Sequence, residues 1–223
     1  MSKISFLGLI LSVWLLMSCT EHKPQIVDTF WQINLRHNPA THEMQEELSL
    51  YVTGDDSDGM EDLKALYIIN DQHHRYWNIL ASEWDTHQIR EEQWVGSSRL
   101  VNGRKPHWDR GVYRLILMDT GGSQDERDIN INSNIFEWQS IPFPSIQVSH
   151  EGIRIEGDQR EYLIFYYDVD GTLISSIHTL SGYSTWDQLK PSSQDTIDYI
   201  EVYTLWEEEG LGLITGPYVI PHA

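Results

Sequence analysis

Carboxylate side chains are the residues of this sequence whose spacing comes closest to that of a chemical site. The first group places five carboxylates within residues 55–62, and its candidates for binding a cation are Asp55, Asp56 and Asp58. Hard cations such as Ca²⁺ prefer clustered oxygen ligands. A twelve-residue calcium loop in this register would need a closing glutamate, but Ala65 stands there. We interpret the segment as a solvated acidic loop, with cation binding as the alternative.

The second group lies in the string Phe-Tyr-Tyr-Asp-Val-Asp-Gly-Thr-Leu at residues 165–173. An apolar strand followed by Asp-x-Asp-Gly-Thr-Leu resembles the first motif of haloacid-dehalogenase-type phosphatases. That resemblance implies a nucleophilic role for Asp168, a general acid/base role for Asp170 and a bound Mg²⁺. The chemistry explains the spacing, because a nucleophilic carboxylate needs a metal ion and a second carboxyl group beside it.

The surroundings of this string favour a β-hairpin over a phosphatase. The motif should open a doubly wound α/β domain, which needs several βαβ units of about 30 residues each. Only 51 residues remain from Leu173 to the end of the sequence, and their pattern is typical of strands. Asp170-Gly171 between two apolar runs is a hairpin signal, because glycine adopts positive φ without steric cost. The phosphatase remains the alternative hypothesis.

No other pattern indicates catalysis or a bound cofactor. The ten histidines are scattered, and the sequence has neither a His-Glu-x-x-His nor a Gly-x-Ser-x-Gly motif nor a glycine-rich phosphate loop. We therefore predict no catalytic residues, no metal ligands and no cofactor, and expect a protein that is not an enzyme. The nine tryptophans are either core residues or a stacking surface for a sugar ring or a partner protein. An exposed tryptophan pair roughly 5–10 Å apart would favour the sugar.

Alternating apolar residues and polar turns predict an all-β fold. Examples are Trp31, Ile33 and Leu35, or the run of Tyr113, Leu115 and Leu117 before a turn. Residues 82–95 are ambiguous, because Ser82-x-x-Asp85 is compatible with a helix-capping box. We expect two tandem immunoglobulin-like antiparallel β-sandwiches: a domain at 29–137, a linker at 138–145 with two prolines, and a second domain at 146–223.

A tyrosine opens the penultimate strand of each predicted domain. These residues are Tyr113 and Tyr199. The placement resembles the tyrosine corner of immunoglobulin-like sandwiches, in which the hydroxyl bonds back to the backbone a few residues upstream. The alternative is that tyrosine is simply common in strands.

The N-terminus indicates membrane attachment. Lys3 precedes an apolar run of about 14 residues, which is short for a membrane span and typical of a signal peptide. The run ends in Leu16-Met17-Ser18-Cys19, which resembles the lipobox of bacterial lipoproteins. The resemblance implies a signal peptide at 1–18, acylation of Cys19 and a polar tether at 19–28. Thr20 after the cysteine implies the outer membrane. A cleaved signal with a chance cysteine, or an uncleaved anchor, is the alternative.

Charge and composition limit the classes of partner that the protein can bind. The chain has 223 residues, 15 Lys and Arg against 34 Asp and Glu, and a net charge of −19, so a nucleic acid would be repelled. Hydrophobic residues make up 40%, enough for a packed core. We therefore expect a lipid-anchored protein of the bacterial cell envelope that binds or scaffolds. Its expected partners are the membrane and an envelope protein or glycan. A carbohydrate- or peptidoglycan-binding lipoprotein is the first alternative.

Overall fold

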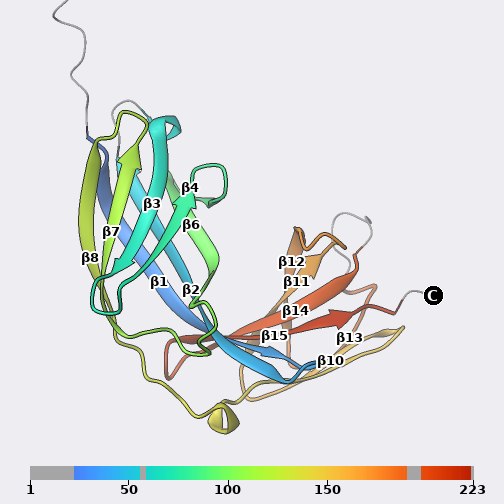
Figure 1. Ribbon diagram of the computed structural model, residues 1–223. Coiled ribbons are helices and arrows are strands. Elements are labelled where there is room, and N and C mark those ends of the chain that lie inside the picture. Colours follow the sequence, from blue (N-terminus) through green and yellow to red (C-terminus); the bar gives the residue numbers. More distant parts are fainter. Residues whose placement is uncertain (1–22, 56–58, 190–196, 222–223) are drawn as a thin grey trace, which may run out of the picture.

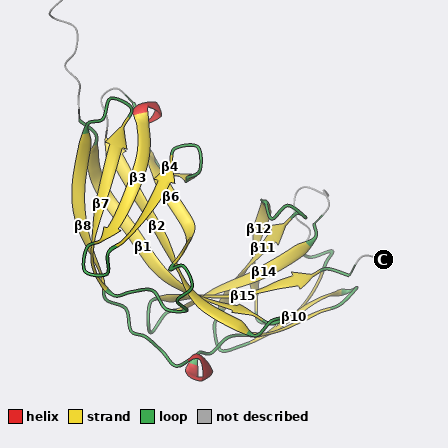
Figure 2. Cartoon of the chain, viewed as in Figure 1, coloured by secondary structure: helices red, strands yellow, loops and turns green. Residues whose placement is uncertain are grey.

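The described residues of the computed structural model are 23–55, 59–189 and 197–221, and they form an all-β protein (Figures 1 and 2). Within these residues there is no α-helix, and the predicted fold class is confirmed. Two single-turn 3-10 helices occur, η1 (Met60–Asp62) and η2 (Trp138–Ser140). The strands are β1 (Gln25–Asn38), β2 (Glu43–Asp55), β3 (Leu63–Asn70), β4 (Arg75–Leu80), β5 (Asp85–Ile89), β6 (Glu92–Val101), β7 (Gly111–Asp119), β8 (Gln124–Ile131), β9 (Ser145–Val148), β10 (Gly152–Glu156), β11 (Glu161–Tyr167), β12 (Leu173–Leu180), β13 (Gly182–Thr185), β14 (Tyr199–Trp206) and β15 (Leu211–Val219).

One curled sheet of eight strands runs through the molecule in the order β12-β11-β14-β15-β1-β2-β6-β5. Its neighbours pair antiparallel except β1 and β15, which pair parallel with Leu35 opposite Leu213. The sheet contains strands from both segments that the sequence separates into domains. The two ends of the chain therefore meet in its middle, and the two halves share a backbone hydrogen-bond ladder.

A first lobe forms where the sheet β4-β3-β7-β8 covers one face of the large sheet (Figure 1). Its core takes the side chains that alternate inward, such as Ile33 and Leu35 of β1 and Leu48 and Leu50 of β2. Each of these four is at most 1% exposed. The strand period of two explains this, because every second side chain points to the covered face.

A second lobe forms where the short sheet β13-β10-β9 covers the other end of the large sheet. Tyr162, Ile164 and Tyr166 of β11 and Ile200 and Val202 of β14 point into this second core. Burial raises the pKa of Tyr166 to about 12, and its hydroxyl donates to the Leu189 carbonyl at 2.9 Å. The two cores therefore lie on the same side of one continuous sheet.

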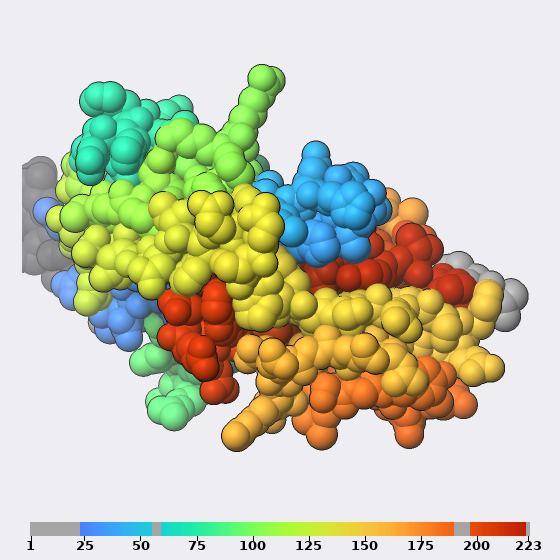
Figure 3. Space-filling view, turned by 90° about the horizontal axis from the view of Figure 1, so that it is seen from below, coloured from blue at the N-terminus to red at the C-terminus, as the bar shows by residue number. Residues whose placement is uncertain are grey.

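The segment between β8 and β9 crosses the junction of the two lobes. Seen from below, its yellow surface runs from one lobe to the other (Figure 3). Ile141 is buried, and Trp138 and Phe143 pack against the first core. The predicted linker at 138–145 is thus held against the first lobe by its apolar side chains.

Two local expectations differ from the structure. Residues 82–95 contain no helix, because β5 and β6 pair as a hairpin and the Asp85 carboxylate accepts hydrogen bonds from Ser98 and Tyr51. The folded body also begins inside the segment predicted as a tether. β1 starts at Gln25, and the buried side chain of Ile26 already belongs to the first core.

Candidate functional site

The structure places Asp168 and Asp170 in the turn of a β-hairpin between β11 and β12, as the sequence predicts. The Asp168 carboxylate accepts the backbone N–H groups of Asp170 at 3.0 Å and Thr172 at 2.8 Å. Gly171 has φ of 78°, which favours glycine. A strand follows this turn where the phosphatase resemblance implies a helix. Asp168 therefore stabilises the turn, and the described residues lack the α/β domain of that family.

The other candidates from the sequence lie mostly beyond the described residues. Cys19, Asp56 and Asp58 fall outside them, and Asp55 is described only as the last residue of β2. Among the described side chains, no group of three or more His, Cys, Asp or Glu is arranged to hold a metal ion. None of the described residues forms a helix long and apolar enough to cross a membrane.

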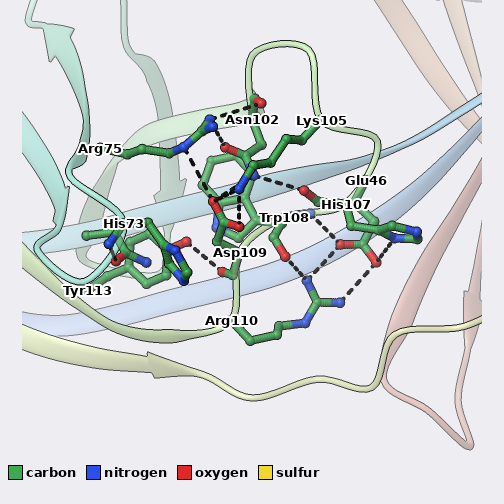
Figure 4. A network of polar contacts seen from close by, with 11 residues as sticks. Glu46, His73, Arg75, Asn102, Lys105, His107, Trp108, Asp109, Arg110 and Tyr113 are labelled. Carbon is green, nitrogen blue, oxygen red and sulfur yellow. Dashed lines mark hydrogen bonds and ion pairs between the residues drawn. The ribbon is translucent and has the colours of Figure 1, made fainter.

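A polar network joins β2 to the loop before β7 (Figure 4). The buried Glu46 carboxylate accepts the Trp108 backbone N–H at 2.7 Å and both terminal nitrogens of Arg110 at 2.7 and 3.0 Å. The His107 ring lies 3.3 Å from the same carboxylate and stacks on Trp138. These contacts brace the loop against the first core, so we assign the network a structural role.

Tyr113 forms the tyrosine corner in this network. Its hydroxyl donates to the Asp109 carbonyl at 2.6 Å, four residues upstream, and its ring is fully buried (Figure 4). Burial tends to raise the pKa of the Asp109 carboxyl, but hydrogen bonds from Lys105 and Asn102 outweigh that effect and lower it. In the second lobe Tyr199 instead stacks on Tyr167, with ring centroids 4.9 Å apart.

Tyr113→Phe should lower the free energy of unfolding by about 1 kcal/mol, the net value of one hydrogen bond. The ring still fills its site, so the loss isolates the hydroxyl. Urea-induced unfolding measures the difference, and Tyr76→Phe serves as the control because Tyr76 is 74% exposed. Equal losses in both variants would contradict the corner's role.

The eight-stranded sheet has a second face that neither smaller sheet covers. We call it the open face. Because successive side chains of a strand point to opposite faces, the open face carries the residues that alternate with the core residues. Its central members are Phe30, Gln32, Asn34 and Arg36 of β1, Glu47, Ser49 and Tyr51 of β2, and Glu201 and Tyr203 of β14.

A row of ionic contacts crosses the middle of the open face. Arg36 on β1 pairs with Glu201 on β14 and, at 2.8 Å, with Glu47 on β2. Arg99 on β6 reaches Glu47 at 3.0 Å. Burial by itself lowers the pKa of Arg36, but attraction by Glu201 and Glu47 holds that pKa above its ordinary value. The row therefore holds four strands together with charges that are fixed in place.

A hollow lies on each side of this ionic row, one lined by apolar and aromatic side chains and the other by a mixture of apolar and polar ones. At the β5 side a hollow of about 260 Å³ is formed by Phe30, Tyr51, His87, Ile89 and Trp94. At the β12 side a hollow of about 400 Å³ is lined by Leu163, Tyr203 and Leu205 together with polar side chains that include Arg160, Glu161, His178 and Glu207. Phe30 is 47% exposed, and Tyr203 is half-buried. These volumes approach or fall within the range of small-molecule sites.

Gly212 on β15 lets Tyr203 and Asn34 meet across the strand between them. A Cβ atom at position 212 would lie 2.1 Å from the Asn34 Oδ1 atom and 2.8 Å from the Tyr203 ring. Without it, the Tyr203 hydroxyl reaches the side-chain amide oxygen Oε1 of Gln32 at 3.5 Å. Desolvation raises the pKa of Tyr203, although this contact opposes the shift. Tyr203 is therefore a neutral hydroxyl at physiological pH.

The tryptophans do not supply the exposed pair that the sequence analysis associated with sugar binding. Among the described residues every tryptophan is buried or half-buried. Trp77 and Trp108 stack at 4.5 Å, but Trp108 is only 1% exposed and belongs to the first core. On the open face, the aromatic rings on which a sugar could stack are phenylalanine and tyrosine rings, together with the half-buried Trp94.

Comparison with known proteins does not identify a family. No protein-family model matches the sequence, and no curated protein matches it. Among solved structures, the dimeric latent form of PorU from Porphyromonas gingivalis is similar over 89% of this chain, with a TM-score of 0.33 and 11% identity. The chain spans 20% of the length of that protein.

Proposed function

We propose that this protein is a lipid-anchored lipoprotein of the bacterial cell envelope that binds a glycan chain without chemical turnover, on the open face of its large sheet. The observation that carries the proposal is the combination of residues on that face. Aromatic rings line the hollow at the β5 side, the half-buried Tyr203 lies in the hollow at the β12 side, and hydrogen-bonding side chains lie between the two hollows. The faces and polar edges of such rings suit a ligand with both apolar and hydroxylated surfaces.

The polar centre of the open face favours a glycan over a protein partner. Protein–protein interfaces are depleted of charged residues at their cores. Here Arg36, Glu47 and Glu201 occupy the centre, each at most 8% exposed. A dry protein interface would have to pack on these charges, whereas a hydroxyl-rich chain can bond to the more accessible polar groups beside them, such as Gln32 and the Tyr203 hydroxyl.

Binding to an array of immobilised oligosaccharides that includes peptidoglycan fragments tests this function. The full chain should bind a subset of the array, and Tyr203→Ala should weaken that binding about tenfold through loss of buried ring area. Tyr76→Ala is the matched control, because Tyr76 lies on β4 in the covering sheet. Absence of glycan binding, or equal binding by Tyr203→Ala and the wild type, would contradict the proposal.

The proposed anchor supports this role by its position. Cys19 precedes the start of β1 at Gln25 by only six residues, or about 20 Å of extended chain. Several acyl chains at Cys19 would give lasting attachment, where one chain would be marginal. The body would then stay near the membrane, and Thr20 favours the outer membrane.

Cys19→Ala should abolish acylation and signal-peptide processing, because the chain has a single cysteine. Incorporation of labelled palmitate in cells measures this, and a band shift on electrophoresis reports processing. Ser18→Ala is the control, since a small residue before the cysteine remains. Label on Cys19→Ala equal to that on the wild type would exclude the lipoprotein anchor.

A further inference from the structure

A cavity of about 460 Å³ adjoins the open face at the turn end of the β1–β2 hairpin. Its walls come from β1, the start of β2, the end of β6 and the loop at 103–106. Arg36 belongs to the wall of this cavity and to the ionic row of the open face. The cavity and the proposed glycan surface are therefore continuous.

The cavity gathers cations in a strongly acidic chain. Its lining includes four of the 15 Lys and Arg residues of the sequence, and Glu43 is its one carboxylate. These cations are Arg36, Arg99, Arg104 and Lys105.

Two of the four cations can still contact a ligand, although only Arg104 among them lacks an ion pair with the described residues. The Arg36 charge is compensated by Glu47 and Glu201, and Lys105 is paired with Asp109 at 2.8 Å. The Arg99 side chain is 54% exposed and shares Glu47 with Arg36. Arg104 is exposed and makes no ion pair with any residue in the described ranges.

We infer that the glycan is acidic and that Arg99 and Arg104 bind its carboxylate groups in this cavity. The inference rests on the proposed function and names its ligand class. Arginine suits the task, since its planar guanidinium bonds to a carboxylate through two parallel N–H groups. With a net charge of −19, the protein repels acidic polymers elsewhere, so the cavity also fixes where such a chain binds.

The test uses an array on which each uronic-acid oligosaccharide is paired with its methyl ester, which removes the charge and keeps the sugar. Wild-type full chain should bind the acids at least about tenfold more tightly than the esters, a preference that added salt weakens. Arg99→Gln/Arg104→Gln should bind acids only as tightly as esters. Arg114→Gln/Arg154→Gln removes the same charge from the covering sheets and should keep the preference.

The possible results distinguish a failure of the acidic-ligand inference from a failure of glycan binding itself. Equal wild-type binding of acids and esters, or a preference that survives Arg99→Gln/Arg104→Gln, overturns the acidic-ligand inference and leaves glycan binding intact. Absence of binding to any oligosaccharide overturns both. Arg104→Gln alone is the variant least expected to disturb folding, because Arg104 makes no ion pair or side-chain hydrogen bond with the described residues, and it should lower the acid preference by itself.

Discussion

Arg36→Met should lower the free energy of unfolding by about 3–5 kcal/mol, because it leaves the buried Glu201 carboxylate without its cation and Glu47 with Arg99 alone. Glu47 is fully buried and Glu201 is 4% exposed, so water cannot replace the guanidinium. Methionine keeps most of the side-chain volume, which limits the loss due to packing. Urea-induced unfolding of the full chain measures the effect.

A charge-matched rescue distinguishes this explanation from simple loss of packing. Arg36→Met/Glu47→Gln/Glu201→Gln removes all three charges and should recover at least half of the lost stability. The control is Arg114→Met, since the pair of Arg114 with Asp71 is exposed and should change stability by under about 1 kcal/mol. If Arg36→Met is as mild as Arg114→Met, the ionic row does not hold the sheet together.

Glu46→Ala should lower the free energy of unfolding by about 3 kcal/mol. The change removes the acceptor of the Trp108 backbone N–H and the carboxylate partner of Arg110, whose side chain is 16% exposed. Glu46→Gln should lose less, because its amide oxygen still accepts a hydrogen bond. Thermal unfolding compares the two variants, and equal stability of Glu46→Ala and the wild type would contradict a bracing role.

Local features of the fold were predictable because neighbouring residues determine them. Asp170-Gly171 between two apolar runs gave the hairpin, since the turn needs only a positive φ and short-range hydrogen bonds. Tyr113 likewise forms its corner bond with a residue four positions away. The local sequence of residues 82–95 did not decide between a helix and strands, because Asp85 suits both a helix cap and the cross-strand hydrogen bonds that it makes.

Pairings between distant segments could not be predicted. Alternation in β1 and β15 shows that both are strands, but it does not show that Leu35 lies opposite Leu213. The polar residues Asn34 and Arg36 alternate with core residues and so indicate a solvent face. Their burial depends on side chains such as Glu201, 165 residues away from Arg36. The candidate site is therefore a product of tertiary pairing and carries no local motif.

Chemical-shift mapping locates the glycan-binding surface residue by residue. The ¹H–¹⁵N spectrum of the full chain in detergent is recorded before and after addition of the oligosaccharide that binds best on the array. We expect the shifted signals to cluster on the open face, around Phe30, Gln32 and Tyr203, and at the cavity beside Arg104. Shifts confined to the covering sheets β4-β3-β7-β8 and β13-β10-β9 would contradict this expectation.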